Sequence, residues 1–184
     1  MRVCILEHFK RYLGEPLRRI EFPETTVCLW PDRDDQRRQI LMTCGMAERP
    51  QKALEGRSLR PNPRTELIIH GKSEDAEILA QTLADLALYP KKNDTFFHWF
   101  HTLPLGRPIV PNSRLDGVLF SFPIMGDADF YTFKCDGQRI DVLQVVPISP
   151  QERELAREKG AQFLDELLEK KYTPISDMLR ASIV

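Results

Sequence analysis

The residues best suited to chemistry are His98 and His101, which stand three apart in an aromatic segment. If that segment is helical, the spacing places two imidazoles on one face, as at many zinc sites, and Cys135 or His70 would have to supply further ligands. The sequence holds no second ligand pair at a fixed spacing. We therefore favour the alternative, in which His101 hydrogen-bonds a loop backbone and His98 lies at the surface, and we expect no metal.

Candidate nucleophiles also lack a catalytic setting. Cys44 precedes a glycine, and Ser113 and Ser121 lie in or beside expected strands, but neither a G-x-S-x-G nor a Cys-Gly-x-Cys pattern surrounds them. Paired carboxylates fall in expected loops, where solvated acids are common; the pairs are Asp34 with Asp35 and Asp127 with Asp129. The sequence thus predicts a protein that is not an enzyme and has no cofactor. A small metal-dependent or hydrolytic enzyme using the His98/His101 region is one alternative, and a regulatory scaffold that binds a peptide of another protein is a second.

Charge and composition narrow the class of partner. The chain has 184 residues, 42% of them hydrophobic, and its formal net charge is -1, from 26 basic and 27 acidic residues. A chain of this length and composition buries a core of its own, so we expect one domain over 1–184. A balanced charge gives no reason to expect nucleic acid or an anionic membrane as partner.

The cysteines and the first residues bear on the compartment. The four cysteines are scattered, so we expect small buried residues in a reducing compartment and not a disulfide framework, with oxidised pairing left open. The sequence begins without the apolar core of a secretory signal, and no apolar run is long enough to span a bilayer. These features favour the cytoplasm.

The elements that must position these residues follow from hydrophobic periodicity. Apolar residues recur at helical spacing over 3–13, and a helix over 73–90 is expected to begin at Ser73 as N-cap and to end at Pro90. Ser149, Pro150 and Glu152 form a capping-box pattern that begins another helix, broken at Gly160. Strands are expected at 17–22, 25–30, 39–46, 65–71, 117–122 and 139–148.

Loops separate these elements. Residues 47–64 carry three prolines and predict a loop that drapes over the sheet, and 123–138 predict an irregular connection with a hairpin turn at Asp136-Gly137. The order of helix, strands, helix, strands, helix is typical of an α+β fold, with a central mixed or antiparallel sheet flanked by helices.

One stretch carries a specific resemblance. A helix ends in Tyr89-Pro90, an aromatic segment with Trp99 runs into His101-Thr102-Leu103-Pro104, and a Gly106-Arg107-Pro108-Ile109 loop precedes the apolar strand at Leu119. This order resembles the central signature of the suppressor-of-fused domain family. Further similar pieces lie at 64–71, 142–160 and 175–178, so the resemblance covers about 36–180.

The resemblance implies an α+β domain without established catalytic residues or cofactor. Animal members are longer, and they clamp a peptide of Gli-type transcription factors as an added strand between two domains. This chain resembles the first domain alone, so half of that clamp is expected to be missing. Short members resemble bacterial proteins, and the family is proposed to supply immunity proteins that neutralise a cognate toxin.

The partner is thus expected to be a protein or peptide, and the aromatic stretch 94–123 divides accordingly. Trp99, Phe97 and Leu103 are interpreted as core. We expect the partner surface at His98, at Arg107, and in the 123–131 loop with Phe130 and Tyr131. Strand addition at an exposed sheet edge flanked by 123–134 is a plausible mode of binding.

Overall fold

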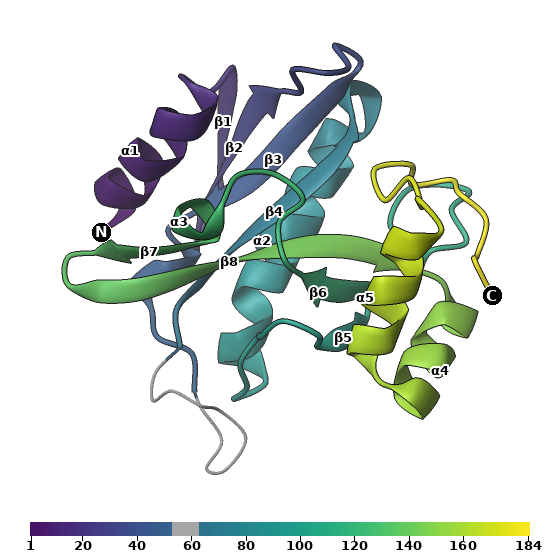
Figure 1. Cartoon of the computed structure of the whole chain (residues 1–184). Coiled ribbons are helices and arrows are strands. Elements are labelled where there is room, and N and C mark those ends of the chain that lie inside the picture. Colours follow the sequence, from purple (N-terminus) through teal and green to yellow (C-terminus); the bar gives the residue numbers. More distant parts are fainter. Residues whose placement is uncertain (53–62) are drawn as a thin grey trace.

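The computed structural model describes residues 1–52 and 63–184. In that part of the chain, eight strands form one sheet in the order β1-β2-β3-β4-β8-β6-β5, and β7 pairs with β8 (Figure 1). The strands are β1 (Arg18–Glu21), β2 (Thr26–Pro31), β3 (Arg38–Cys44), β4 (Thr65–Lys72), β5 (Thr102–Pro104), β6 (Gly117–Ser121), β7 (Thr132–Cys135) and β8 (Gln138–Ile148). The helices are α1 (Arg2–Leu13), α2 (Ala76–Lys92), α3 (Ala128–Tyr131), α4 (Pro150–Lys159) and α5 (Ala161–Lys170).

The sheet is mixed, which confirms the predicted α+β fold. Strands β1 to β4 pair antiparallel in chain order, whereas β4 and β8 run parallel. Strand β8 holds the sheet together because its length lets it pair with β4, β6 and β7 at once. Gln144, near its middle, lies opposite both Ile68 and Ser121.

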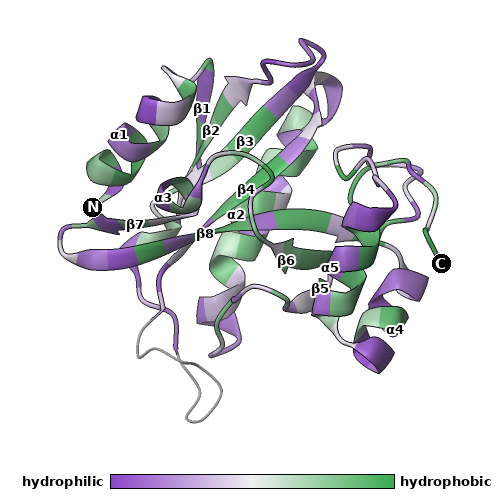
Figure 2. Ribbon diagram, in the orientation of Figure 1, coloured by the Kyte–Doolittle hydropathy of each residue, from purple (hydrophilic) through white to green (hydrophobic). Residues whose placement is uncertain are grey.

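Successive residues of β8 belong to different cores, as the alternation of a strand requires. Leu143 and Val145 pack with α2 on one face of the sheet. On the other face, Ile140 and Val142 lie in a core with residues of α1, and Val146 and Ile148 lie in a core with residues of α4 and α5. Figure 1 shows α2 behind the sheet, with α1 at one end of the front face and α4 and α5 at the other. The green of β8 in Figure 2 marks this hydrophobic centre.

Two helix boundaries differ from the sequence prediction. Ser73 is not an N-cap but begins a 3-10 turn (η2, Ser73–Asp75), and α2 then starts after Asp75. Pro90 lies inside α2, which continues to Lys92. A proline in the last turn is tolerated because the turn is held by other donors: the amide of Asn93 donates to the carbonyl of Tyr89.

Other local predictions are confirmed. Ser149 caps α4 in a full capping box with Glu152, and Gly160 separates α4 from α5. Asp136 and Gly137 both have positive φ, of 51° and 75°, in the turn between β7 and β8. Positive φ at both central residues is the geometry that a two-residue hairpin turn favours.

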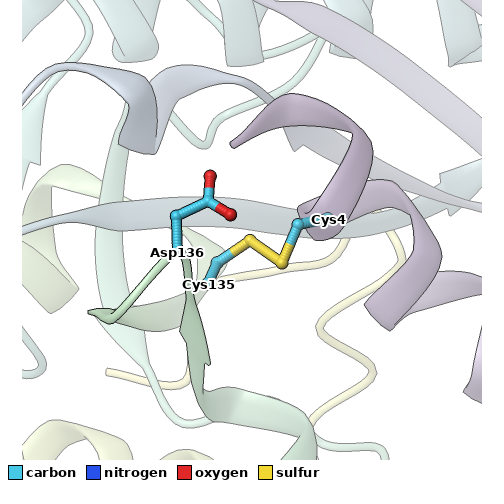
Figure 3. A group of neighbouring side chains, drawn as sticks. All are labelled: Cys4, Cys135 and Asp136. Carbon is cyan, nitrogen blue, oxygen red and sulfur yellow. A yellow bond between two sulfur atoms is a disulfide. The ribbon is translucent and has the colours of Figure 1, made fainter.

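The cysteine prediction is wrong for one pair. Cys4 of α1 and Cys135 of β7 form a disulfide across 131 positions of sequence (Figure 3). Cys28 and Cys44 are free and buried, as expected. Sequence spacing gave no sign of this pair because the fold alone brings α1 over the β7–β8 hairpin.

The connections hold more structure than predicted. Within 123–138 the chain forms α3 and β7, and β5 arises within the His-Thr-Leu-Pro motif. A 3-10 turn (η1, Met46–Glu48) opens the loop predicted at 47–64, and the central part of that loop, 53–62, lies outside the described residues. None of the described helices is long and apolar enough to cross a membrane.

Candidate protein-binding surface

The paired histidines do not share a helical face. Residues 95–101 form an extended segment and a turn, and Phe100 between them has a φ of 64°. The two rings lie with their centroids 6.1 Å apart, and His98 places its Nδ1 atom 3.3 Å from the Trp99 carbonyl. Burial lowers the pKa of His101, and the neighbouring His98 lowers it further. The geometry is that of two packed loop residues.

The residues named as possible further metal ligands lie elsewhere. Cys135 is bound to Cys4, and among the described residues the one cluster of metal-ligand type is Cys4, Cys135 and Asp136. In that cluster the sulfurs form the disulfide (Figure 3), and the Asp136 carboxylate is occupied by an ion pair with the amino group of Met1 at 2.8 Å. His70 is buried on β4, and burial lowers its pKa to about 4. The described residues do not bring a further ligand to His98 and His101.

Two of the other candidates for chemistry, Ser113 and Asp127, have structural partners. Ser113 donates to the Met178 carbonyl and accepts from the Leu115 amide. Asp127 caps α3 by accepting from the amides of Asp129 and Phe130. These contacts explain the residues without catalysis.

Phe130 is not at the surface, contrary to expectation: its side chain is 0% exposed. It belongs to a group that we call the inner aromatic cluster, which joins α1 to the sheet and to α3. Its ring lies 5.1 Å from that of Tyr12 and 6.0 Å from that of Phe9, and the Nε2 atom of His8 donates to the Phe130 carbonyl at 3.0 Å. The members are His8, Phe9, Tyr12, Trp30, Phe130 and Phe133.

Tyr131, the next residue, lies in a different group. We call Trp99, Phe100, Phe122 and Tyr131 the outer aromatic cluster. Trp99 and Phe122 stack at 4.7 Å, and Tyr131 lies 5.5 Å from Phe122. Phe122 is 39% exposed and the other three are half-buried, so the cluster reaches the surface. The indole nitrogen of Trp99 has no hydrogen-bond partner among the described residues.

A single turn of helix separates the two clusters. Asp127 caps α3, and successive residues of a helix point about 100° apart, so Phe130 turns toward α1 while Tyr131 turns toward Trp99. Gly126 precedes the turn with a φ of 76°, and a Cβ there would lie 2.5 Å from the Cβ of Phe130. The loop can close over Phe130 only with glycine at this position.

Phe100 occupies a conformation that is rare for a bulky side chain. Its φ of 64° lies in the left-handed region, and its amide donates to the Phe120 carbonyl. Such strain persists only where surrounding contacts hold it, and it gathers at functional sites. Here it turns the chain so that Trp99 and Phe100 both reach Phe122.

The remaining residues named from the sequence lie in different places. His98 packs at 5.1 Å against Trp99 and so borders the outer cluster. Arg107 is exposed but lies elsewhere, beside α2, where it donates to Thr82 and pairs with Asp85. Trp99 is only half-buried, whereas Phe97 is in the core as predicted.

The ends of the sheet are shielded against strand addition. Edge strand β1 carries the charged residues Arg18, Arg19 and Glu21, and edge strand β5 is short and contains Pro104, which has no amide hydrogen. Side chains therefore offer a better contact surface than these two edges. Strand β7, which among the described strands pairs with β8 alone, is a third and short edge of four residues. The sequence interpretation missed Phe100 and Phe122, although the aromatic density around them was the available signal.

Comparison with known proteins gives a consistent result. The family profile described as suppressor of fused protein matches residues 16–181. Among curated protein sequences, none matches this chain.

Solved structures match the fold. A suppressor of fused homologue from Neisseria gonorrhoeae FA 1090 superposes with a TM-score of 0.77 at 17% identity, covering 100% of this chain and 96% of that one. A chain of the Sufu-Fu complex gives 0.69 at 15% identity, covering 97% and 88%. Drosophila Suppressor of Fused gives 0.70 at 14% identity, and there the match covers 98% of this chain but only 50% of the other.

Proposed function

This chain belongs to the suppressor of fused family, and from that premise we propose that it is a non-catalytic protein-binding domain. The described residues join in one sheet, which supports the proposal that 1–184 act as a single domain. A related fold was solved as the Sufu-Fu complex, which supports a protein as the partner here.

The outer aromatic cluster is the observation that carries this proposal. Exposed aromatic side chains supply much of the energy at protein interfaces, and a contiguous apolar patch on a soluble protein commonly marks one. The ring of Trp99 packs against those of Phe122 and Tyr131. These two rings are therefore already ordered and lose little entropy on binding. His98 stands at the border of the cluster as a polar contact, in keeping with a polar rim.

The partner we propose is a toxin encoded beside this chain, which makes the chain a bacterial immunity protein. The fold likeness to the Neisseria homologue spans nearly all of both chains, whereas the likeness to Drosophila Suppressor of Fused spans half of that chain. This difference supports a role of the bacterial kind more than one of the animal kind. The immunity role itself comes from the family resemblance. Tight capping of a toxin surface would need no catalytic group on this chain.

Co-expression with the neighbouring gene tests the proposal. Induction of that gene in a bacterial host should stop growth, and the wild-type chain should restore it. A Phe122→Ala/Tyr131→Ala variant should restore it poorly, and the purified variant should bind the gene product more weakly by calorimetry. Phe163→Ala, which removes an exposed aromatic from the remote face of α5, is the matched control and should behave as wild type. A neighbouring product that is neither toxic nor bound would exclude the immunity role.

The proposed location is the cytoplasm, and the disulfide makes that location testable. Cytoplasmic thiols are normally kept reduced. Lysis of the cells directly into denaturant with an alkylating reagent, which also reaches the buried Cys135, should modify Cys4 and Cys135 if the chain resides there. Protection of both residues from the reagent would place the chain in an oxidising compartment.

The same purified protein tests the enzyme alternative that uses His98 and His101. Elemental analysis should find no stoichiometric metal. A stoichiometric metal lost in His101→Ala would favour the enzyme instead.

A further inference from the structure

A groove adjoins the outer aromatic cluster and shares Phe122 with it. It lies between α5 and the loop that leaves β6, and it has a volume of about 480 Å³. In Figure 1 this loop passes from β6 across β8 to α3, on the same face of the sheet as α5. Val146 of β8 and Leu168 of α5 line the groove from within, and both are buried.

The rim of the groove exposes large apolar side chains. Ile124 is 64% exposed and Tyr172 is 93% exposed, while Phe122 is 39% exposed. All three line the groove, so the apolar surface runs on from the outer cluster. An exposed apolar strip of this kind costs solubility and marks an interaction site.

The polar lining of the groove is acidic. Asp165 and Glu169 are one turn apart on α5 and therefore on one face, and both line the groove. Within 1–52 and 63–184, neither carboxylate has an ion-pair partner. Burial raises the pKa of Asp165, and a hydrogen bond from Ser121 offsets part of that effect. The hydroxyl oxygen of Thr173, another lining residue, is buried and has no hydrogen-bond partner in the described part of the chain.

Tyr172 occupies a position where glycine is the favoured residue. The amide of Thr173 donates to the Leu168 carbonyl and that of Tyr172 to the Glu169 carbonyl, which is the Schellman pattern at the end of a helix. The φ of Tyr172 is 50°, in the left-handed region that strains a bulky residue. A strained tyrosine whose ring lies almost wholly in solvent adds little to the stability of the fold. We therefore expect Tyr172 to contribute to binding.

We propose that this groove binds a segment of the protein partner in which an apolar side chain stands next to Lys or Arg. The apolar side chain packs on Val146 and Leu168 between Ile124 and Tyr172, and the cation bridges Asp165 and Glu169. Charge complementarity selects this occupant, because two unpaired carboxylates beside an apolar wall disfavour an acidic or purely apolar one. The inference rests on the proposed function and names the chemistry of the partner.

Peptide selection tests the inference without the natural partner. Random-sequence peptides displayed on phage are panned on the wild-type protein, and the enriched peptides are synthesised and titrated by fluorescence anisotropy. They should carry Lys or Arg beside an apolar residue. Loss of a charge-assisted contact predicts binding to Asp165→Asn/Glu169→Gln that is about tenfold to a hundredfold weaker. Glu166→Gln is the matched control on the same helix, since Glu166 does not line the groove, and it should bind as wild type.

Enriched peptides without a basic residue would overturn the inference, as would equal binding to the double variant or a failure to enrich any peptide. Peptides that depend on Tyr131 but not on Asp165 and Glu169 would overturn it while leaving the proposed function standing. The proposed function fails separately if the neighbouring gene product does not bind. If sedimentation velocity shows a dimer of the wild-type chain that is lost in Ile124→Ser, the occupant of the groove is a second copy of the chain and not a peptide of another protein.

Tyr172→Gly separates binding from folding. Glycine relieves the left-handed backbone, so the melting temperature should stay equal or rise while peptide affinity falls. Unchanged affinity would remove Tyr172 from the site and count against the groove.

Discussion

The inner and outer aromatic clusters are built from similar residue types and meet at the consecutive residues Phe130 and Tyr131, yet they differ in how far they are buried. The inner cluster is enclosed by α1, by α3 and by the sheet, and Phe130 within it is wholly buried. The outer cluster rests on the end of β6 and leaves Phe122 in solvent. Aromatic density therefore does not by itself identify a binding surface: what matters is whether another element covers it.

The covering element here is α1. It lies before the residues that match the family profile, which begin at 16. Ile5 and Phe9 bury its apolar side against the sheet, and Cys4 ties it to β7. The outer cluster has no such cover among the described residues, and this absence is what suggests a partner.

Removal of Phe130 should give the largest effect and sharpen the contrast. Phe130→Ala is expected to lower the free energy of unfolding by about 3–5 kcal/mol, because it leaves a cavity among fully packed rings. Urea denaturation followed by fluorescence would measure the loss. A loss no larger than that of Tyr131→Ala would break the distinction between the clusters.

Removal of the disulfide should affect the inner cluster next. Cys4→Ser/Cys135→Ser is expected to lose about 2–4 kcal/mol of stability, because the crosslink closes a long loop. The wild-type protein should be destabilised by reductant and the variant should not. A wild-type protein indifferent to reductant would show that α1 is held by packing alone.

The buried acid Glu66 predicts how the stability of the fold depends on pH. Glu66 is buried, and burial raises its pKa to about 7, although it accepts hydrogen bonds from Thr43, Gly45 and Ala47. The folded state then binds a proton that the unfolded state, with the ordinary value of 4.5, has released. Between these two values stability should fall as pH rises, by at most about 1.4 kcal/mol per pH unit.

Glu66→Gln removes this titrating group and should flatten that part of the pH profile. Denaturant titrations at several pH values measure the slope. Glu169→Gln, in the open groove, is the comparison variant. An unchanged slope in Glu66→Gln would assign the pH dependence to other groups.

Tyr131→Ala should have the smallest effect on stability. Its ring is half-buried, so we expect a loss of about 1 kcal/mol, together with clearly weaker partner binding. Tyr131→Phe keeps the ring and should retain most of the binding. Full binding by Tyr131→Ala would move the interface away from the outer cluster.

Much of the fold was predictable because it is encoded locally. The strand β8, the capping box at Ser149 and the turn at Asp136-Gly137 each depend on neighbours in sequence. The helix boundaries predicted at Ser73 and Pro90 were wrong, because α2 is preceded by a 3-10 turn and accepts a proline in its last turn. The short elements α3, β5 and β7 lack periodicity of their own and form only against β6 and β8.

The candidate surface was only partly predictable. Tyr131 and His98 were named from the sequence and do meet at Trp99, whereas Phe130 was expected beside them and lies in the core. Nothing in the sequence distinguishes an aromatic that α1 will cover from one that stays open.

The sequence by itself determined the family, the fold class and the helix and turn signals, because these rest on residue order and on contacts a few positions apart. Only the tertiary structure decided which aromatics are exposed, that Cys4 meets Cys135, and that Asp165 faces the loop after Ser121. Those relations join elements distant in the chain. They arise when α1 and α5 pack on opposite ends of one sheet face, and local sequence cannot specify that arrangement.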